Sequence, residues 1–108
     1  MNITIKDLQG YLAQCYGGNV NDQSLFMKLV EEVGEVAEAL NKRSGRKFAD
    51  EDNHQQRLGE ELADMLHYIV AIASVNEIDL TKSILEKDLL AAVKYNREMN
   101  LTKFLSEK

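Results

Sequence analysis

Apolar residues recur at the three- and four-residue spacing of a helix along almost the whole chain, and the sequence contains no proline. This pattern predicts an all-α protein with four helices. We expect the first over about Ile5–Tyr16, the second from Asn21 or Asp22 to about Arg43, the third over about His54–Asn76 and the fourth over about Leu80–Met99.

Local signals support these boundaries. The pair Gly17-Gly18 suits the left-handed stop after a helix, and Asp79 is a suitable N-cap for the fourth helix. The polar stretch Ser44–Asn53 predicts a loop between the second and third helices. Two long helices joined by this loop should form a central antiparallel hairpin that folds about residue 48. The tail, residues 100–108, is expected to be loosely held.

Two acidic clusters lie on the helices of this predicted hairpin. Glu32 and Glu35 stand three residues apart on the second helix, and Glu61 and Asp64 do so on the third. At that spacing two side chains leave the same helix face, about 5–6 Å apart at Cβ. If the hairpin folds about residue 48, position 32 faces 64 and position 35 faces 61, so the two pairs lie at one height.

Four converging carboxylates would repel one another without a cation between them, because burying unpaired charge costs several kcal/mol per ion. Mg²⁺ prefers such oxygen ligands and keeps water molecules that a phosphate can replace. The pattern therefore predicts a Mg²⁺ site, with Mn²⁺ as a possible substitute. The alternative is a solvated acidic face, which fits Glu31, Glu38 and Glu60, because they lie opposite the apolar stripes. Gly34 and Gly59, inside the helices, indicate close helix approach, ligand access or simple tolerance.

The composition limits the class of protein. A chain of 108 residues has room for one domain, residues 1–108, and a domain of this size gains from sharing a core with a second copy. A net charge of -5 opposes nucleic-acid binding, which depends on clustered basic residues. The single cysteine, Cys15, and the absence of a long apolar stretch favour a cytoplasmic protein without a membrane segment. The fourth helix is apolar on more than one side, which also favours a homodimer or a dimer of dimers.

The two acidic motifs resemble those of a known family. Glu31-Glu32-Val33-Gly34-Glu35 followed by Glu61-Leu62-Ala63-Asp64 is similar to the Glu-Glu-x-x-Glu and Glu-x-x-Asp signature of MazG-like members of the all-α nucleoside triphosphate pyrophosphatase superfamily. Lys28-Leu29-Val30 and Met65-Leu66-His67-Tyr68 also resemble it. The resemblance covers about Leu25 to Arg97.

The resemblance implies a reaction in which a metal-activated water attacks the α-phosphorus of a nucleoside triphosphate and releases the monophosphate and pyrophosphate. It implies that Glu32, Glu35, Glu61 and Asp64 bind the metal, and one carboxylate of the cluster would take the proton of the water. It further implies phosphate contacts from the last helix. The residues that make these contacts would be Lys94, Asn96 and Arg97. A different alignment with the family would place Lys87 on the phosphates.

Two further residues are candidates for substrate contacts. Tyr68 falls on the ligand side of its helix, where it would face a base or sugar, although core packing is an equal account. Lys28 faces position 68 across the hairpin and is a candidate phosphate contact. His67 is expected at the surface or in an interface.

A house-cleaning nucleotide pyrophosphohydrolase is the leading function, and three alternatives stand beside it. A phosphoribosyl-ATP pyrophosphohydrolase of the same superfamily would keep the same metal site. A di-iron carboxylate bundle would need histidine ligands in two elements, and His54 does not supply the second. A non-catalytic helical dimerisation module would bind no metal tightly.

Overall fold

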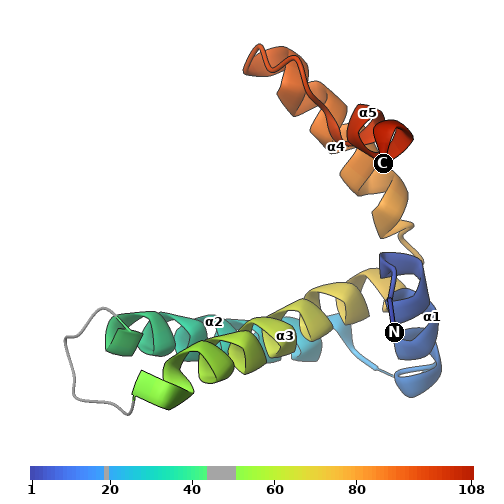
Figure 1. Cartoon of the computed structure of the whole chain (residues 1–108). Helices are drawn as coiled ribbons and strands as arrows, with labels where there is room; N and C mark the ends of the chain where they lie inside the picture. Colours follow the sequence, from blue (N-terminus) through green and yellow to red (C-terminus); the bar gives the residue numbers. More distant parts are fainter. Residues whose placement is uncertain (19, 44–50) are drawn as a thin grey trace.

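The computed structural model describes residues 1–18, 20–43 and 51–108, and these residues form five helices and no strand. The helices are α1 (Ile5–Cys15), α2 (Asp22–Arg43), α3 (Glu51–Val75), α4 (Leu80–Lys94) and α5 (Leu101–Glu107). Figure 1 shows α2 and α3 side by side as a long antiparallel hairpin, with α1 against the far end of α3. From that end α4 leads away from the hairpin, and α5 returns along α4. The predicted all-α fold with a central hairpin is confirmed.

Short polar side chains begin the helices where the sequence places them. At α1, Thr4 Oγ1 accepts a hydrogen bond from the Asp7 N–H and the Asp7 carboxylate accepts one from the Thr4 N–H, both at 3.0 Å. This reciprocal pair satisfies two donors that a helix start would otherwise leave free. Asn21 Oδ1 accepts from the Gln23 N–H at 2.7 Å, and Asp79 accepts from the Lys82 N–H at 3.1 Å. The predicted cap at Asp79 is therefore confirmed.

The hairpin differs from the prediction at its loop. The third helix begins at Glu51, three residues before the predicted His54, so the end of the predicted loop is helical. The polar composition that suggested a loop is also compatible with the first turn of a helix. The rest of the predicted loop, residues 44–50, and the expected fold about residue 48 lie outside the described residues.

The C-terminal quarter also differs from the prediction. The fourth helix ends at Lys94 instead of Met99, because Asn96 adopts the left-handed conformation with φ 54°. The Arg97 N–H then donates to the Ala92 carbonyl at 2.8 Å, which closes the helix end. In the tail that was expected to be loosely held, Leu101–Glu107 form the helix α5, Asn100 caps this helix, and the Leu101 N–H donates to Asp88.

The small core lies where α1 crosses the hairpin. It consists of Leu12, Leu25, Val70 and Ala71, with six partly buried apolar residues around it. Leu12 and Val70 are fully buried. One residue of α1 thus joins α1 to both helices of the hairpin.

Replacing Leu12 with alanine should lower the free energy of unfolding by about 3 kcal/mol, because a buried leucine leaves a cavity. Urea denaturation would measure the loss. Ile3→Ala is the control, since Ile3 is exposed before α1 and should change stability by less than about 0.5 kcal/mol. Equal effects of the two substitutions would contradict this account of the core.

Large apolar side chains remain exposed on the hairpin and on α4. On the hairpin they form one stripe on each helix, and both stripes lie about a quarter turn from the contact between α2 and α3, on the same side of the hairpin. We call this surface the apolar face; it consists of Phe26, Val30, Val33, Leu62, Leu66 and Ile69, which are 36–55% exposed. Within the described residues no helix has the length and apolar content needed to cross a bilayer.

Candidate metal centre

Three of the four predicted carboxylates come together across the hairpin. Glu32 on α2 meets Glu61 and Asp64 on α3, and one oxygen from each lies within 4.8 Å of the others. Glu32 and Glu61 are half-buried between the helices, whereas Asp64 is exposed. The two helices therefore hold the acidic groups at one height, and we call these three residues the carboxylate triad.

Glu35 is not part of the carboxylate triad. It is exposed one turn further along α2, and its negative charge still contributes to the electrostatics of Glu32. The predicted convergence of four carboxylates is thus a convergence of three, with the fourth beside them. The three-residue spacing leaves Glu32 and Glu35 on one side of α2 but about 60° apart around its axis, and of the two only Glu32 is half-buried between the helices.

The local environment raises the pKa of Glu32 above its ordinary value. Partial burial contributes most, followed by the negative charges of Asp64, Glu61, Glu35 and Glu31. Among the described residues, the ion pairs join other residues: Lys28 with Glu31, Lys42 with Glu38 and Arg97 with Asp88. None of these ion pairs of the described residues includes a member of the carboxylate triad, so none of them offsets its charge.

A divalent cation fits this donor set. Carboxylate oxygens are the ligands that Mg²⁺ and Ca²⁺ prefer, and opposite ligands of Mg²⁺ lie about 4.2 Å apart. Oxygens within 4.8 Å of one another could reach such an ion with small side-chain movements. The exposed position of Asp64 leaves one side open for water or for a ligand.

We expect Glu32→Gln to raise the melting temperature of the metal-free protein and to abolish its stabilisation by Mg²⁺. Because folding raises the pKa of Glu32, the metal-free protein should lose stability as pH rises from the ordinary glutamate pKa through the raised value. Glutamine removes this repulsion but also removes a ligand. In the wild type, Mg²⁺ at about 100 times its Kd should raise the melting temperature by on the order of 10 °C.

Thermal denaturation with and without Mg²⁺, at several pH values, would test this. Gln55→Glu, which adds an acid at an exposed position of α3, is a suitable control because it leaves the carboxylate triad unchanged. A Glu32→Gln variant that is less stable without metal and still gains stability from Mg²⁺ would contradict the assignment.

The two predicted substrate contacts on the hairpin, Lys28 and Tyr68, differ in burial. Lys28 is exposed one turn before Glu32 and pairs with Glu31 at 3.4 Å. Tyr68 is partly buried and packs against the core, with its ring edge-on to His67 at a centroid distance of 4.9 Å. Of the two predicted roles of Tyr68, contact with a base or sugar and core packing, its position favours core packing.

The predicted contacts on the fourth helix lie elsewhere in the chain. Lys94, Asn96 and Arg97 are at the end of α4, which packs mainly on α1 and α5 and leads away from the hairpin (Figure 1). Lys94 lies over the Tyr95 ring at 5.4 Å, and Arg97 pairs with Asp88 at 3.6 Å. One chain does not bring these groups to the carboxylate triad.

Sequence reasoning missed two features next to the carboxylate triad. Tyr16 and His67 share a hydrogen bond of 2.6 Å between the hydroxyl and Nε2, so His67 is half-buried against α1 instead of lying at the surface. Arg57 lies one turn before Glu61, and both line an open groove of about 310 Å³. The four-residue spacing of Arg57 and Glu61 was the available signal for the second feature.

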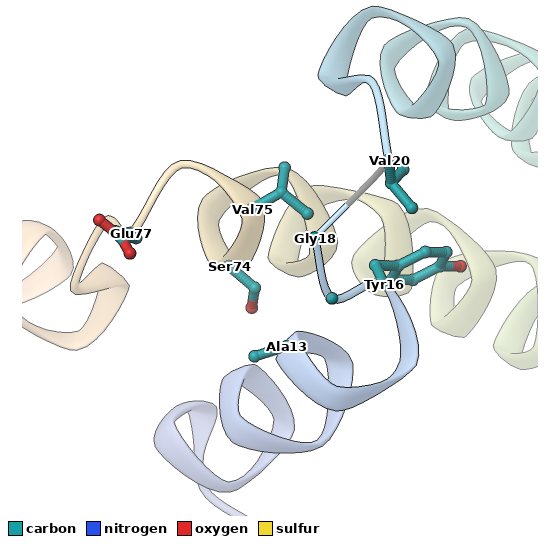
Figure 2. Close-up of a pocket in the computed structure, with 8 residues that line it drawn as sticks. Ala13, Tyr16, Gly18, Val20, Ser74, Val75 and Glu77 are labelled. Carbon is teal, nitrogen blue, oxygen red and sulfur yellow. The ribbon is translucent and has the colours of Figure 1, made fainter.

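A separate cavity lies at the other end of α3. It has a volume of about 340 Å³ and lies between the end of α1, the segment that follows it and the last turn of α3 (Figure 2). Ser74 and Val75, in its wall, are at least ten residues beyond Asp64, or about 15 Å along the helix. It is therefore not part of the candidate metal centre.

Neither internal glycine of the hairpin is explained by packing within the chain. An added Cβ at Gly34 or at Gly59 would meet nothing within 4 Å. Close approach of α2 and α3 is therefore not the reason for these glycines. Ligand access remains a prediction.

Fold and site together define an all-α protein with a candidate cation site held between two antiparallel helices. Comparison with known families adds the chemistry: residues 20–97 match the model of the MazG nucleotide pyrophosphohydrolase domain. This match covers most of the chain, and the chain belongs to the MazG nucleotide pyrophosphohydrolase family.

Individual proteins are also similar to this chain. The chain is 30% identical over 84 residues to the uncharacterized protein YpjD of Bacillus subtilis (strain 168), a match that covers 74% of this chain and 76% of that protein. It is 35% identical over 68 residues to dCTP pyrophosphatase 1 of Rattus norvegicus, covering 60% of this chain but only 40% of that protein. The crystal structure of iMazG from Vibrio DAT 722 superimposes with a TM-score of 0.64 at 31% identity, covering 88% of this chain and 100% of that one.

Proposed function

We propose that this protein is a Mg²⁺-dependent nucleoside triphosphate pyrophosphohydrolase that converts a (deoxy)nucleoside triphosphate to the monophosphate and pyrophosphate. The observation that carries the proposal is the carboxylate triad, whose oxygens lie within 4.8 Å of one another and take part in none of the ion pairs found among the described residues. In a chain of the MazG family, a metal ion with a nucleotide phosphate is the ligand that best fits this arrangement. Removal of damaged or surplus nucleotides is the role we propose.

The chemistry divides between the metal and the protein. A bound Mg²⁺ would neutralise phosphate charge and lower the pKa of a water molecule. Glu32, Glu61 and Asp64 would hold it, while Glu35 would complete its coordination or take the proton of the attacking water. The water oxygen forms a bond to the α-phosphorus, and the bond from that phosphorus to the bridging oxygen of the β-phosphate breaks. Pyrophosphate then leaves with the bridging oxygen.

We also propose that the active protein is a homo-oligomer, either a dimer or a dimer of dimers. The apolar face of the hairpin and apolar residues of α4, such as Leu90 and Val93, are exposed in one chain. Such large contiguous apolar surfaces usually mark an interface. Association would also let Lys94, Asn96 and Arg97 of one copy reach the substrate at the carboxylate triad of another, which a single chain does not achieve.

The proposal is tested with a panel of ribo- and deoxynucleoside triphosphates, together with phosphoribosyl-ATP, assayed for pyrophosphate with Mg²⁺ or Mn²⁺. dCTP belongs in the panel because a relative of this chain is named a dCTP pyrophosphatase. Reaction in ¹⁸O-labelled water should place the label in the monophosphate, because the α-phosphorus is attacked. Release of inorganic phosphate, or activity unaffected by EDTA, would refute the proposed reaction.

The proposed location is the cytoplasm. The only cysteine, Cys15, is a free and exposed thiol, which suits a reducing compartment. Fractionation of the source cells with an antibody to the protein would test this.

A further inference from the structure

The connection between α3 and α4 is a short elbow formed by residues 76–79, and both of its ends are anchored. The Ile78 N–H donates to the Ala73 carbonyl at 2.9 Å, which closes α3, and Asp79 caps α4. Glu77 adopts a left-handed conformation with φ 55°, which is unusual for a residue other than glycine. A sharp bend of this kind sets the direction of α4.

One residue of α1 holds this elbow from outside. Gln9 Nε2 donates to the Ile78 carbonyl at 2.7 Å, and Gln9 Oε1 accepts from the Leu80 N–H at 3.0 Å. The Ser74 hydroxyl donates to the Gln9 carbonyl at 3.0 Å. Gln9 therefore joins α1, the end of α3 and the start of α4 through groups that lie 65 to 71 residues away in sequence.

The side-chain amide of Gln9 offers one donor and one acceptor, and the elbow presents one acceptor and one donor to it. The Leu80 N–H belongs to the first residue of α4 and has no partner within that helix, and the Ile78 carbonyl lies two residues before it. Only a side chain with a donor and an acceptor side by side satisfies both groups. A methionine has no donor and only a weak acceptor, and an ionised glutamate offers only acceptors.

The orientation of α4 depends strongly on this elbow, because α4 packs mainly on α1 and α5 and leads away from the hairpin (Figure 1). A helix of 15 residues is about 22 Å long, so a change of about 10° at its start moves its end by about 4 Å. Lys94 lies at that end. A displacement of this size would move a phosphate contact out of reach of its ligand.

We propose that Gln9 is a positioning residue, which sets the angle between α4 and the hairpin and thereby places the basic end of α4 for nucleotide binding. The inference deepens the proposed function and rests on it for its catalytic consequence. Gln9 itself does not touch the substrate. Its effect on the angle is a property of the fold and can be measured independently of activity.

Gln9→Met is the main test, with Gln14→Met as the matched control, because Gln14 is exposed on the same helix. At a temperature where circular dichroism shows both variants folded, Gln9→Met should raise KM for the triphosphate roughly tenfold. The Mg²⁺ concentration for half-maximal activity should not change, because the carboxylate triad lies on the hairpin. A merely destabilised protein would not separate these two quantities.

A distance measurement supplies the readout that does not depend on activity. Spin labels at Gln55→Cys on α3 and Glu86→Cys on α4, in a Cys15→Ser background and diluted with unlabelled protein, report the angle between the two helices. We expect a narrow distance distribution with Gln9 or with Gln14→Met, and a broad or shifted one with Gln9→Met. A folded Gln9→Met protein with the wild-type distribution and KM would overturn the proposal.

Gln9→Glu keeps the proposal testable if Gln9→Met does not fold. A protonated glutamic acid has a donor and an acceptor placed like those of glutamine, whereas the ionised form has no donor. The distance distribution should therefore be narrower near pH 4, where about two-thirds of a carboxyl group with the ordinary pKa of about 4.3 is protonated, than near pH 7, where it is ionised. An unchanged narrow distribution across this range would overturn the proposal. If the wild type releases no pyrophosphate, the proposed function fails, and the distance measurement still decides the role of Gln9.

Discussion

Asp64→Asn should reduce kcat/KM for pyrophosphate release by more than about 100-fold while leaving the helical content unchanged. Changes to groups that merely support a metal ligand cost about 10–100-fold, so loss of the ligand itself should cost more. Asparagine keeps the size of the side chain but removes the charge that balances Mg²⁺. Because Asp64 is the exposed member of the carboxylate triad, the substitution should not destabilise the fold. Steady-state kinetics and circular dichroism measure the two expectations.

Glu60→Gln is the matched control for this experiment. Glu60 is an exposed acid on the same helix, where it accepts a hydrogen bond from Gln56 at 3.2 Å, and it is outside the carboxylate triad. Its substitution should change kcat/KM by less than about twofold, because the amide oxygen of glutamine can still accept the hydrogen bond from Gln56 and the carboxylate triad is unchanged. EDTA should abolish the activity of both the wild type and this control. Activity that survives Asp64→Asn would refute the assignment of the metal centre.

Leu66→Asp should dissociate the protein into monomers and abolish most of its activity. Leu66 is 43% exposed in one chain, so aspartate at this position does not enter the core of the monomer. In an interface formed by the apolar face, however, the buried charge would cost several kcal/mol per copy. Sedimentation velocity should show a monomer with the helical content of the wild type. Gln14→Asp, which adds the same charge on α1, should leave the assembly intact.

Mixing two inactive variants tests whether the copies share a site. Asp64→Asn disables the carboxylate triad, and Lys94→Ala removes a basic group from α4. If Lys94 acts on the carboxylate triad of a partner, a mixture that exchanges subunits should recover part of the wild-type activity. One site of each mixed assembly then combines the intact triad of the Lys94→Ala copy with Lys94 of the Asp64→Asn copy. Dissociation by Leu66→Asp without loss of activity, together with failure of the mixture, would exclude a shared site.

The placement of the helices could be predicted in large part from local sequence. Thr4, Asn21 and Asp79 each satisfy N–H groups two or three residues away, so these helix starts depend on few neighbours. The stop at Asn96 and the cap at Asn100 are local features of the same kind. Helical spacing and a fold about residue 48 predicted that position 32 faces 64 and position 35 faces 61, and Glu32, Asp64 and Glu61 do meet.

What the sequence by itself determined about this protein is therefore its helices, its hairpin and the acidic residues that face one another, because these follow from contacts one or two turns apart and from one antiparallel pairing. Tertiary structure alone decided that Glu35 lies beside the carboxylate triad and that His67 forms a hydrogen bond with Tyr16. It also decided that α4 leads away from the hairpin, with Gln9 bonded to its first N–H. The contacts of His67 and Gln9 join residues 51 to 71 positions apart, whose meeting no local pattern encodes.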